Sequence, residues 1–333
     1  MAKRDRSQLD LFPRPPEPVG PAPVPDEVKA LGAELPSTLY LGTSSWTFPG
    51  WKGLVYDREV SGARLSREGL IPYSQHPVLR AAGIDRTFYG PVTTGTFAAY
   101  AAQVPASFRF LVKAHEVCTL ARYPVHSRYG DQRGQPNPRF LDAAYARDAV
   151  VAPFVEGLGE KGGPLVFQFP PQHLEDLGGI GPFVERLHAF LSALPKGPLY
   201  AVEVRNEALL CESFAQALAD VGVCPVMAVW GRMPPVELQA LRTHALRARA
   251  LVARWMLPPH LTYEEARARY FPFNQLVEPD VRNREGLSRL CVAAAHASLP
   301  TFVILNNKAE GSAPLSALAL AQSVVIGMQR GGA

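Results

Sequence analysis

The sequence predicts an α/β fold, a (β/α)₈ barrel of the TIM-barrel type, in which eight parallel strands alternate with helices. Short apolar runs alternate with amphipathic segments from about residue 40 to the end of the chain. The number of these runs and the length of the region that holds them fit one barrel. Several runs are apolar throughout, which is typical of strands buried on both faces of a parallel sheet.

The strands follow one another in regular order. Amphipathic segments such as 183–194 and 286–299 separate them and are followed by Gly or Pro, where helices usually end. A doubly wound open sheet is the structural alternative, but no glycine-rich phosphate loop follows the first strand. The expected strands are Tyr40–Ser44, Ile84–Tyr89, Arg109–Lys113, Leu165–Phe169, Leu199–Val204, Pro225–Val229, Leu251–Arg254 and Phe302–Asn306.

The composition favours a globular protein with a large core. Apolar residues make up 47% of the 333 residues and charged residues 19%, which excludes disorder throughout the chain. The net charge of +4 permits an anionic ligand without demanding one. We expect a cytoplasmic protein without a membrane span, and we predict no cofactor and no metal-ligating residues. The cysteines form no CxxC pair, which argues against a disulfide framework or a structural zinc site and suits a reducing compartment: Cys118, Cys211, Cys224 and Cys291.

The chain divides into an N-terminal tail and a barrel domain. Residues 13–25 contain seven prolines in thirteen positions, which predicts an extended spacer. We therefore expect residues 1–36 to form a flexible tail and residues 37–330 to form the barrel.

Polar residues at the carboxyl ends of the strands are the candidate site, because the loops that follow those ends build the sites of barrel enzymes. Glu203 and Lys113 are the candidate catalytic residues. Alternation along the strand places Glu203 and Arg205 on the same side. The candidate ligand-binding residues are Trp46, Trp51, Thr87, Tyr89, His115, Gln168, Arg205, Arg254, Asn306, Asn307 and Lys308.

Each candidate has a structural alternative. Glu203 could act as a general acid or base while Arg205 holds an anion, or the two could form a buried structural ion pair. Trp46, Trp51 and Tyr89 could stack on a ring at the rim of the barrel, or belong to the core. His115 lacks companions at metal-ligand spacing, which favours an ordinary loop histidine.

The charge balance at the strand ends favours an anionic ligand. Four cations accompany Glu203, the one strongly placed carboxylate, which disfavours a multi-metal hydrolase. The leading hypothesis is a barrel that binds or acts on nucleic acid or a phosphorylated small molecule. The second is a carbohydrate-active or isomerase-type enzyme that uses Glu203 with Gln168 and Asn306. The four cations are Lys113, Arg205, Arg254 and Lys308.

Six ordered motifs resemble those of the YecE-like family (domain of unknown function 72). They are LGTSSWTFPGWKG at 41–53, TFY at 87–89, FRFLVKA at 108–114, GPLVFQFPP at 163–171, YAVEVRN at 200–206 and VILNNKAEGSAPLSA at 303–317. The resemblance covers roughly residues 38–325. It implies a TIM barrel with the motif residues gathered at one end, and no established activity.

The sequence departs from the family pattern at several of these positions. Ser45 replaces a glycine, and Gly83 and Asp85 stand where the family has a carboxylate and an asparagine. The segment Arg254–Leu257 lacks the family's histidine, and Lys308 replaces an aspartate. These changes shift the expected site further toward positive charge.

A short motif near the N-terminus resembles the peptide that binds the bacterial DNA polymerase sliding clamp. Such an extended peptide inserts its Leu-Phe pair into an apolar pocket. The prediction is recruitment to the clamp, and a non-enzymatic, clamp-tethered binding module is a third hypothesis. The alternative is that the same side chains dock on the protein's own barrel. The motif consists of Gln8, Leu9, Asp10, Leu11 and Phe12.

Overall fold

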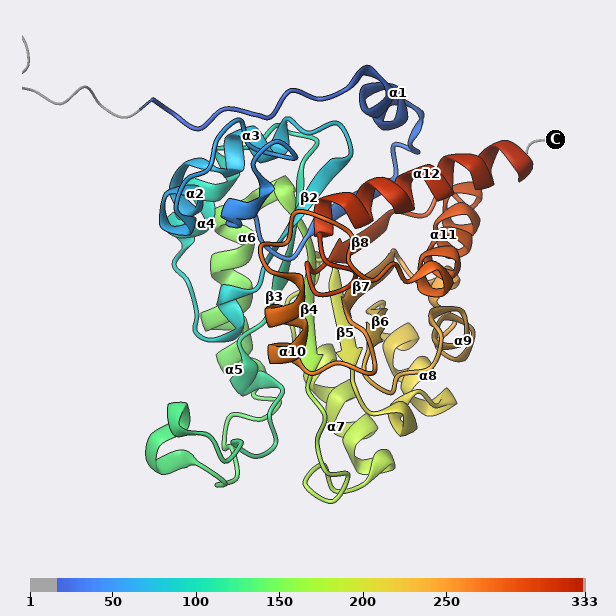
Figure 1. Ribbon diagram of the computed structural model, residues 1–333. Coiled ribbons are helices and arrows are strands. Elements are labelled where there is room, and N and C mark those ends of the chain that lie inside the picture. Colours follow the sequence, from blue (N-terminus) through green and yellow to red (C-terminus); the bar gives the residue numbers. More distant parts are fainter. Residues whose placement is uncertain (1–16, 332–333) are drawn as a thin grey trace, which may run out of the picture.

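The computed structural model describes residues 17–331 and contains the expected closed barrel. All neighbouring strands pair in parallel, and pairing between the first and the last strand closes the barrel. The predicted α/β fold class is therefore confirmed (Figure 1). The strands are β1 (Leu39–Thr43), β2 (Leu79–Ile84), β3 (Arg109–Lys113), β4 (Gly162–Phe169), β5 (Tyr200–Val204), β6 (Cys224–Trp230), β7 (Leu251–Leu257) and β8 (Thr301–Leu305).

Helices surround the barrel, and α10 lies in front of the strands in the view of Figure 1. The main helices are α1 (Asp26–Glu34), α2 (Gly62–Glu68), α3 (Leu70–Ser74), α4 (Thr94–Ala101), α5 (Ala143–Ala146), α6 (Ala152–Leu158), α7 (Ile180–Ser192), α8 (Glu212–Asp220), α9 (Val236–Arg242), α10 (Tyr263–Tyr270), α11 (Val281–His296) and α12 (Ala313–Gly331).

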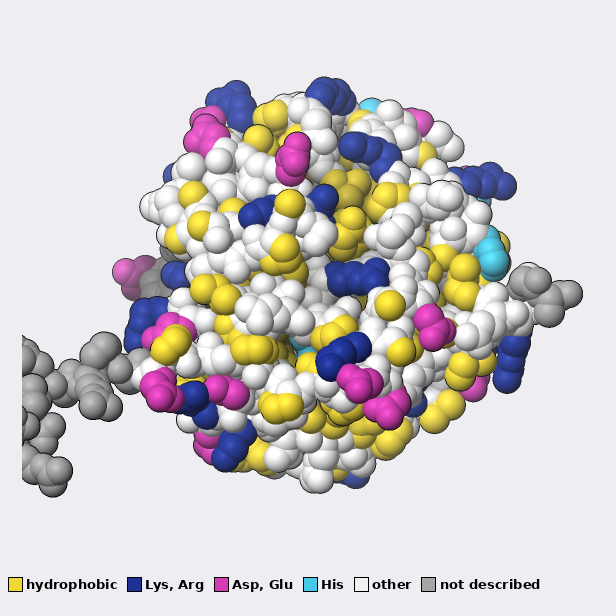
Figure 2. Space-filling model, turned by 90° about the horizontal axis from the view of Figure 1, so that it is seen from above, with side chains coloured by type: hydrophobic (Ala, Val, Ile, Leu, Met, Phe, Trp, Pro, Cys, Tyr) yellow, Lys and Arg dark blue, Asp and Glu magenta, His cyan; other side chains and the backbone are white. Residues whose placement is uncertain are grey.

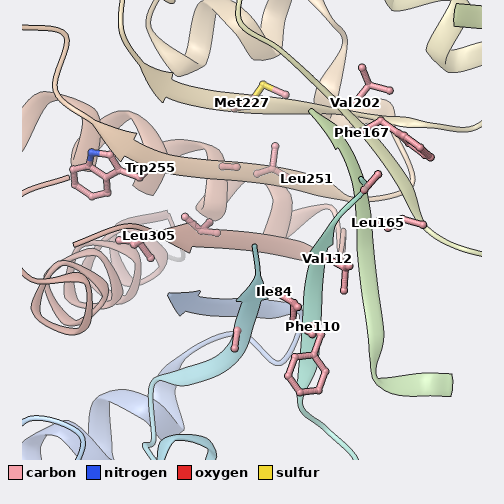
Figure 3. Packing of buried hydrophobic residues seen from close by; sticks show 14 of the residues in the cluster. Ile84, Phe110, Val112, Leu165, Phe167, Val202, Met227, Leu251, Trp255 and Leu305 are labelled. Carbon is pink, nitrogen blue, oxygen red and sulfur yellow. The ribbon is translucent and has the colours of Figure 1, made fainter. Parts of the chain in front are cut away.

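The two faces of the strands belong to different apolar clusters. The larger cluster joins the outward faces of the strands to the helices, and Figure 3 shows part of it, including Val112, Phe167 and Trp255. The smaller cluster is made almost wholly of strand residues, such as Leu111, Val166 and Phe302, which therefore fill the interior of the barrel. This inner layer closes the barrel as a packed core and leaves only its ends for a site.

The helices cover the barrel through apolar stripes at helical spacing. In α7 the buried side chains are Phe183, Val184, Leu187, Phe190 and Leu191, which recur on one face of the helix. Phe183 packs edge-on against Phe169 of β4, with ring centroids 5.2 Å apart. The apolar face that the amphipathic pattern of this segment predicts is therefore the face of α7 that packs against the barrel.

The predicted second strand, Ile84–Tyr89, was misplaced. The strand ends at Ile84, and Arg86–Phe88 form a single 3-10 turn. Small residues precede Ile84 because a side chain at Gly83 would approach the Cα of Ser44 to 3.0 Å. This crowding explains why β2 lacks the bulky apolar run that usually marks a buried strand.

The expectation of a flexible tail up to residue 36 was wrong for residues 17–36. Val19 and Ala22 are buried, and the backbone N–H of Ala22 donates to the carbonyl of Val55 at 3.0 Å. Helix α1 packs on α12 beside the barrel (Figure 1). Proline removes backbone N–H donors from a segment, but the apolar side chains between the prolines can still be buried against the barrel domain. The motif at residues 8–12 lies outside the described residues.

The surface carries both signs of charge. On the face in Figure 2, basic and acidic side chains are interspersed with apolar ones. Many arginines are paired with carboxylates, for example Arg122 with Asp176 at 2.9 Å. Between residues 17 and 331, none of the helices has the length and apolar character needed to cross a membrane.

Candidate active site at the carboxyl end of the barrel

Polar side chains form a layer above the apolar interior of the barrel. Along β3, β4 and β5 the inward positions run from Leu111, Val166 and Ala201 to Lys113, Gln168 and Glu203. The same alternation along β7 brings Arg254 inward after Val252. All four polar side chains are buried: their residues are 7%, 3%, 0% and 0% exposed, in the order Lys113, Gln168, Glu203 and Arg254.

Glu203 lies at the centre of a hydrogen-bonded group that we name the Glu203 network: Asp85, Gln168, Glu203, Arg205 and Arg254. One carboxylate oxygen of Glu203 accepts from Nε of Arg205 at 2.8 Å, and the other accepts from Nη1 of Arg254 at 2.7 Å. The Oε1 of Gln168 accepts from both guanidinium groups, at 3.3 and 3.2 Å. The network thus joins four strand ends of the barrel.

Asp85, the first residue after β2, completes the network. Its carboxylate lies 3.3 Å from Nη2 of Arg254 and its side chain is 29% exposed. The misplaced second strand had hidden this second carboxylate from the sequence prediction. Its position directly after the strand end is the signal that could have revealed it.

The network keeps Glu203 ionised. Burial alone would raise the pKa of Glu203, but the charges of Arg254 and Arg205 outweigh it and hold that pKa at about 2. A carboxylate with this pKa does not exchange a proton readily near neutral pH. The geometry therefore argues against the acid–base role expected of Glu203 and for a role in positioning Arg205 and Arg254.

Lys113 is buried beside the network without an ion-pair partner. Its Nζ lies 3.7 Å from the centroid of the Phe88 ring, and no described residue accepts a hydrogen bond from it. Burial lowers the pKa of Lys113 to about 8, although Asp85 and Glu203 act in the opposite direction. The Oγ1 of Thr87 donates to the carbonyl of Lys113 at 2.6 Å, which fixes the backbone there.

Three adjacent strands offer hydrogen-bond donors without acceptors in the described part of the chain. These are Nζ of Lys113, Nε2 of Gln168 and Nη1 of Arg205, which we name the donor group. The guanidinium of Arg205 also packs over Trp230, 4.7 Å from the ring centroid, which limits its movement. Two of these donors belong to cationic groups, and charge-assisted donors bind anions and carbonyl oxygens strongly, so these three side chains suit an anionic or carbonyl ligand.

Aromatic side chains lie around this end of the barrel. Tyr89 is 67% exposed, and the guanidinium of Arg128 lies 5.2 Å from its ring centroid. Arg128 in turn pairs at 2.6 Å with Glu116, which is 8% exposed. Tyr263, at the start of α10, is also exposed. Tyr89 remains a candidate stacking residue. The sequence analysis did not identify Arg128, Glu116 or Tyr263 as neighbours of this end of the barrel.

The loop after β8 is held mostly by the protein itself. Asn306 donates to Oγ of Ser44 at 2.9 Å, and Oδ1 of Asn307 accepts from Trp51 and from the first N–H of α12. Lys308 is 5% exposed, with Nζ 4.0 Å from the ring centroid of Tyr263. Among residues 17–331, Lys308 and the buried Nδ2 of Asn307 are the donors of this loop that lack an acceptor.

Three expected ligand-binding residues have structural roles instead. Trp46 and Trp51 are 4% and 0% exposed and belong to the core, so they are not stacking platforms at the rim. Trp51 packs against the rings of Phe48, Tyr56 and Tyr73. Thr87 uses its hydroxyl to join the end of β2 to β3. In the described part of the chain these side chains pack against, or hydrogen-bond to, the protein itself.

His115 lies outside the Glu203 network. Its Nδ1 is 2.6 Å from the hydroxyl of Tyr145, and burial lowers its pKa. This is the loop histidine that its spacing indicated. Within the described ranges, no three His, Cys, Asp or Glu side chains are grouped so as to hold a metal ion.

Comparisons with known proteins concern nearly the whole barrel. The family model described as "Protein of unknown function DUF72" matches residues 40–331. A comparison with curated proteins gave no match. Among solved structures, a DUF72 family protein from Enterococcus faecalis V583 is 16% identical, with a TM-score of 0.55, 86% of this chain covered and 95% of that one.

Two further structures show the same fold. A DUF72 family protein from Thermotoga maritima MSB8 is 18% identical, with a TM-score of 0.53 and coverage of 85% of this chain and 98% of that one. A methyltransferase from Methanosarcina mazei is 11% identical, with a TM-score of 0.50 and coverage of 92% and 98%. At these identities the likeness concerns the fold alone.

Proposed function

Because the chain belongs to the DUF72 family, whose function is unknown, we propose a function from its own site: it binds a small anionic, phosphate- or carboxylate-bearing molecule at the carboxyl end of the barrel. The observation that carries this proposal is the donor group. Lys113, Gln168 and Arg205 end three adjacent strands and present donors for which residues 17–331 supply no acceptor. An anion would satisfy all three donors at once.

Burial favours a small ligand over nucleic acid. Lys113 and Gln168 are 7% and 3% exposed, so the phosphates of a duplex would have difficulty reaching them. Binding to a nucleic acid backbone usually depends on exposed cations along one face. Several exposed arginines of this chain are instead paired with carboxylates, such as Arg242 with Glu207 and Arg289 with Glu237.

A thermal-shift titration tests the proposal. Inorganic phosphate, ribose 5-phosphate and a 2-oxo acid such as pyruvate are expected to raise Tm, whereas ribose is not, because only a bound anion pairs with the donor group. Arg205→Met is expected to weaken binding about 10- to 100-fold, since it removes a charge-assisted donor. The matched control is Arg249→Met, an exposed arginine at the opposite end of the barrel, which should leave binding unchanged.

Other results of the same titration would contradict the proposal. Stabilisation by ribose or another neutral sugar alone would favour the carbohydrate alternative, in which Gln168 and Asn306 position hydroxyl groups. Binding to DNA that weakens steeply with salt, without any response to small anions, would favour nucleic acid instead.

The clamp-binding motif supports a separate proposal, recruitment to the sliding clamp. Gln8, Leu9, Asp10, Leu11 and Phe12 match the pattern of the clamp-binding peptide, and they precede the region that packs on the barrel. In a pull-down with purified bacterial clamp, the wild-type chain is expected to be recovered. The double substitution Leu11→Ala/Phe12→Ala should abolish recovery, because it removes the apolar anchors of the peptide.

The matched control for the pull-down is Val24→Ala, in the proline tract outside the motif. Equal recovery of the wild-type and the doubly substituted chain would exclude the motif as the binding element.

A further inference from the structure

Lys113 differs from the chain's other described lysines in its surroundings. Lys29 pairs with Asp26 at 2.7 Å, and Nζ of Lys161 donates to two backbone carbonyls. Lys308 packs over two aromatic rings in the loop after β8. Only Lys113 combines burial at a strand end with nearby carboxylates and guanidinium groups. The structure thus encloses an amine among charges without pairing it.

Lys113 is held by neighbouring residues at its backbone and at its amine. Thr87 holds the backbone carbonyl of Lys113, and the ring of Phe88 covers one side of the amine. Alternation along β3 directs the side chain inward, toward the same space as Gln168 and Glu203. A side chain fixed in this way loses little conformational entropy when it reacts.

We infer that Lys113 is a nucleophile that forms a Schiff base with an aldehyde or ketone carrying an anionic group. This inference rests on the anion site proposed above. The neutral amine attacks the carbonyl carbon, and a C–N bond forms while the oxygen takes a proton. The carbinolamine then loses this oxygen, which leaves as water with the two hydrogens of the amine, and the imine remains. No oxidant, reductant or metal is required.

The electrostatics of the site favour both the attack by the neutral amine and the protonated imine that results. With a pKa of about 8, Lys113 has a neutral fraction at pH 7.5 that is roughly two hundred times that of an exposed lysine. The carboxylates of Asp85 and Glu203 then favour the protonated imine, which is positively charged.

The donor group limits the class of substrate. Once Lys113 bonds to the carbonyl carbon, Arg205 and Gln168 remain to hold an anionic group on the same molecule. Gln168 lies on β4, next to β3, and Arg205 directly follows β5, the strand beyond β4. These places suit a small compound in which that group lies close to the carbonyl. A 2-oxo acid or a phosphorylated aldehyde or ketone has this form.

Borohydride trapping tests the inference on the full chain. The protein is incubated with pyruvate, glyoxylate, dihydroxyacetone phosphate or glyceraldehyde 3-phosphate, reduced, digested and mapped by mass spectrometry. At least one probe is expected to label Lys113 at least tenfold more than the exposed Lys52 or Lys196. The labelling rate should rise with pH around a midpoint near 8, because only the neutral amine attacks.

Lys113→Arg is the matched variant, since it keeps the positive charge but cannot form the imine. It is expected to show no labelling above that of the exposed lysines. The wild-type peptide map decides the question by itself if this variant does not fold. Labelling of Lys113 no greater than that of Lys52 would overturn the inference.

Two outcomes separate this inference from the proposed function. Thermal stabilisation by these probes without trapping on Lys113 would overturn the nucleophile and leave the anion site intact. Neither stabilisation nor trapping with any probe would contradict both.

Discussion

Glu203→Gln is expected to lower the free energy of unfolding at pH 7 by about 3–5 kcal/mol. The substitution removes the charge that both Arg254 and Arg205 contact, at 2.7 and 2.8 Å. Arg254 is 0% exposed and would keep only the longer contacts, with Asp85 at 3.3 Å and with Oε1 of Gln168 at 3.2 Å. Urea unfolding of the wild type and the variant measures the loss directly.

The pH dependence of this loss follows from the pKa of Glu203. The folded state holds that pKa at about 2, below the ordinary value of 4.5. The stabilisation by Glu203 is therefore complete above about pH 4.5 and is lost as the pH falls toward 2. The difference between wild type and Glu203→Gln should shrink over the same range.

Two controls define the origin of the effect. Glu207→Gln changes an exposed carboxylate four residues further along and should alter stability by less than about 0.5 kcal/mol. The double substitution Glu203→Leu/Arg254→Met removes both buried charges and should recover much of the loss. A variant Glu203→Gln as stable as the wild type would show that the network does not hold the strand ends.

Lys113→Met is expected to raise the free energy of unfolding at pH 7 by about 1–3 kcal/mol. Burial lowers the pKa of Lys113 from 10.5 to about 8, which corresponds to a cost of roughly 3 kcal/mol for keeping the ammonium charged. Methionine fills a similar volume without charge, although it gives up the attraction between the ammonium and the Phe88 ring. Urea unfolding at pH 7 measures the gain.

The gain should disappear at high pH. Between about pH 8 and 10.5 the unfolded chain keeps the proton of Lys113 while the folded chain does not, so wild-type stability rises over this range. The advantage of Lys113→Met should therefore shrink as the pH rises through it. Lys52→Met, at an exposed lysine, is the control and should be neutral at all these pH values. A destabilised Lys113→Met would assign the lysine to the fold and not to a ligand.

A residue that costs stability at a strand end is typical of a functional site. Lys113 and Glu203 illustrate two different cases. Glu203 is fully compensated by its guanidinium partners, whereas Lys113 has no compensating acceptor among the described residues. The opposite signs of the two expected stability changes express this difference.

The amino-acid pattern alone predicted the barrel and most of its strand ends. β3 was predicted at its observed bounds, because in the run RFLVK an apolar stretch is bounded by one charged residue at each end. Polar residues at or near the carboxyl ends of buried strands were identified in the same way: Glu203, Lys113, Gln168, Arg205 and Arg254. Period-two alternation and burial are local properties, so they can be read from a single sequence.

Only the tertiary structure decided which of these residues are open to a ligand. It placed Trp46 and Trp51 in the core, since an aromatic residue in a loop has the same local pattern whether it packs inward or outward. It added Asp85 to the network through a contact with Arg254, 169 positions away in the sequence. It also left Lys113 without a partner, and partners across a barrel depend on strand order and register, which local sequence patterns do not encode.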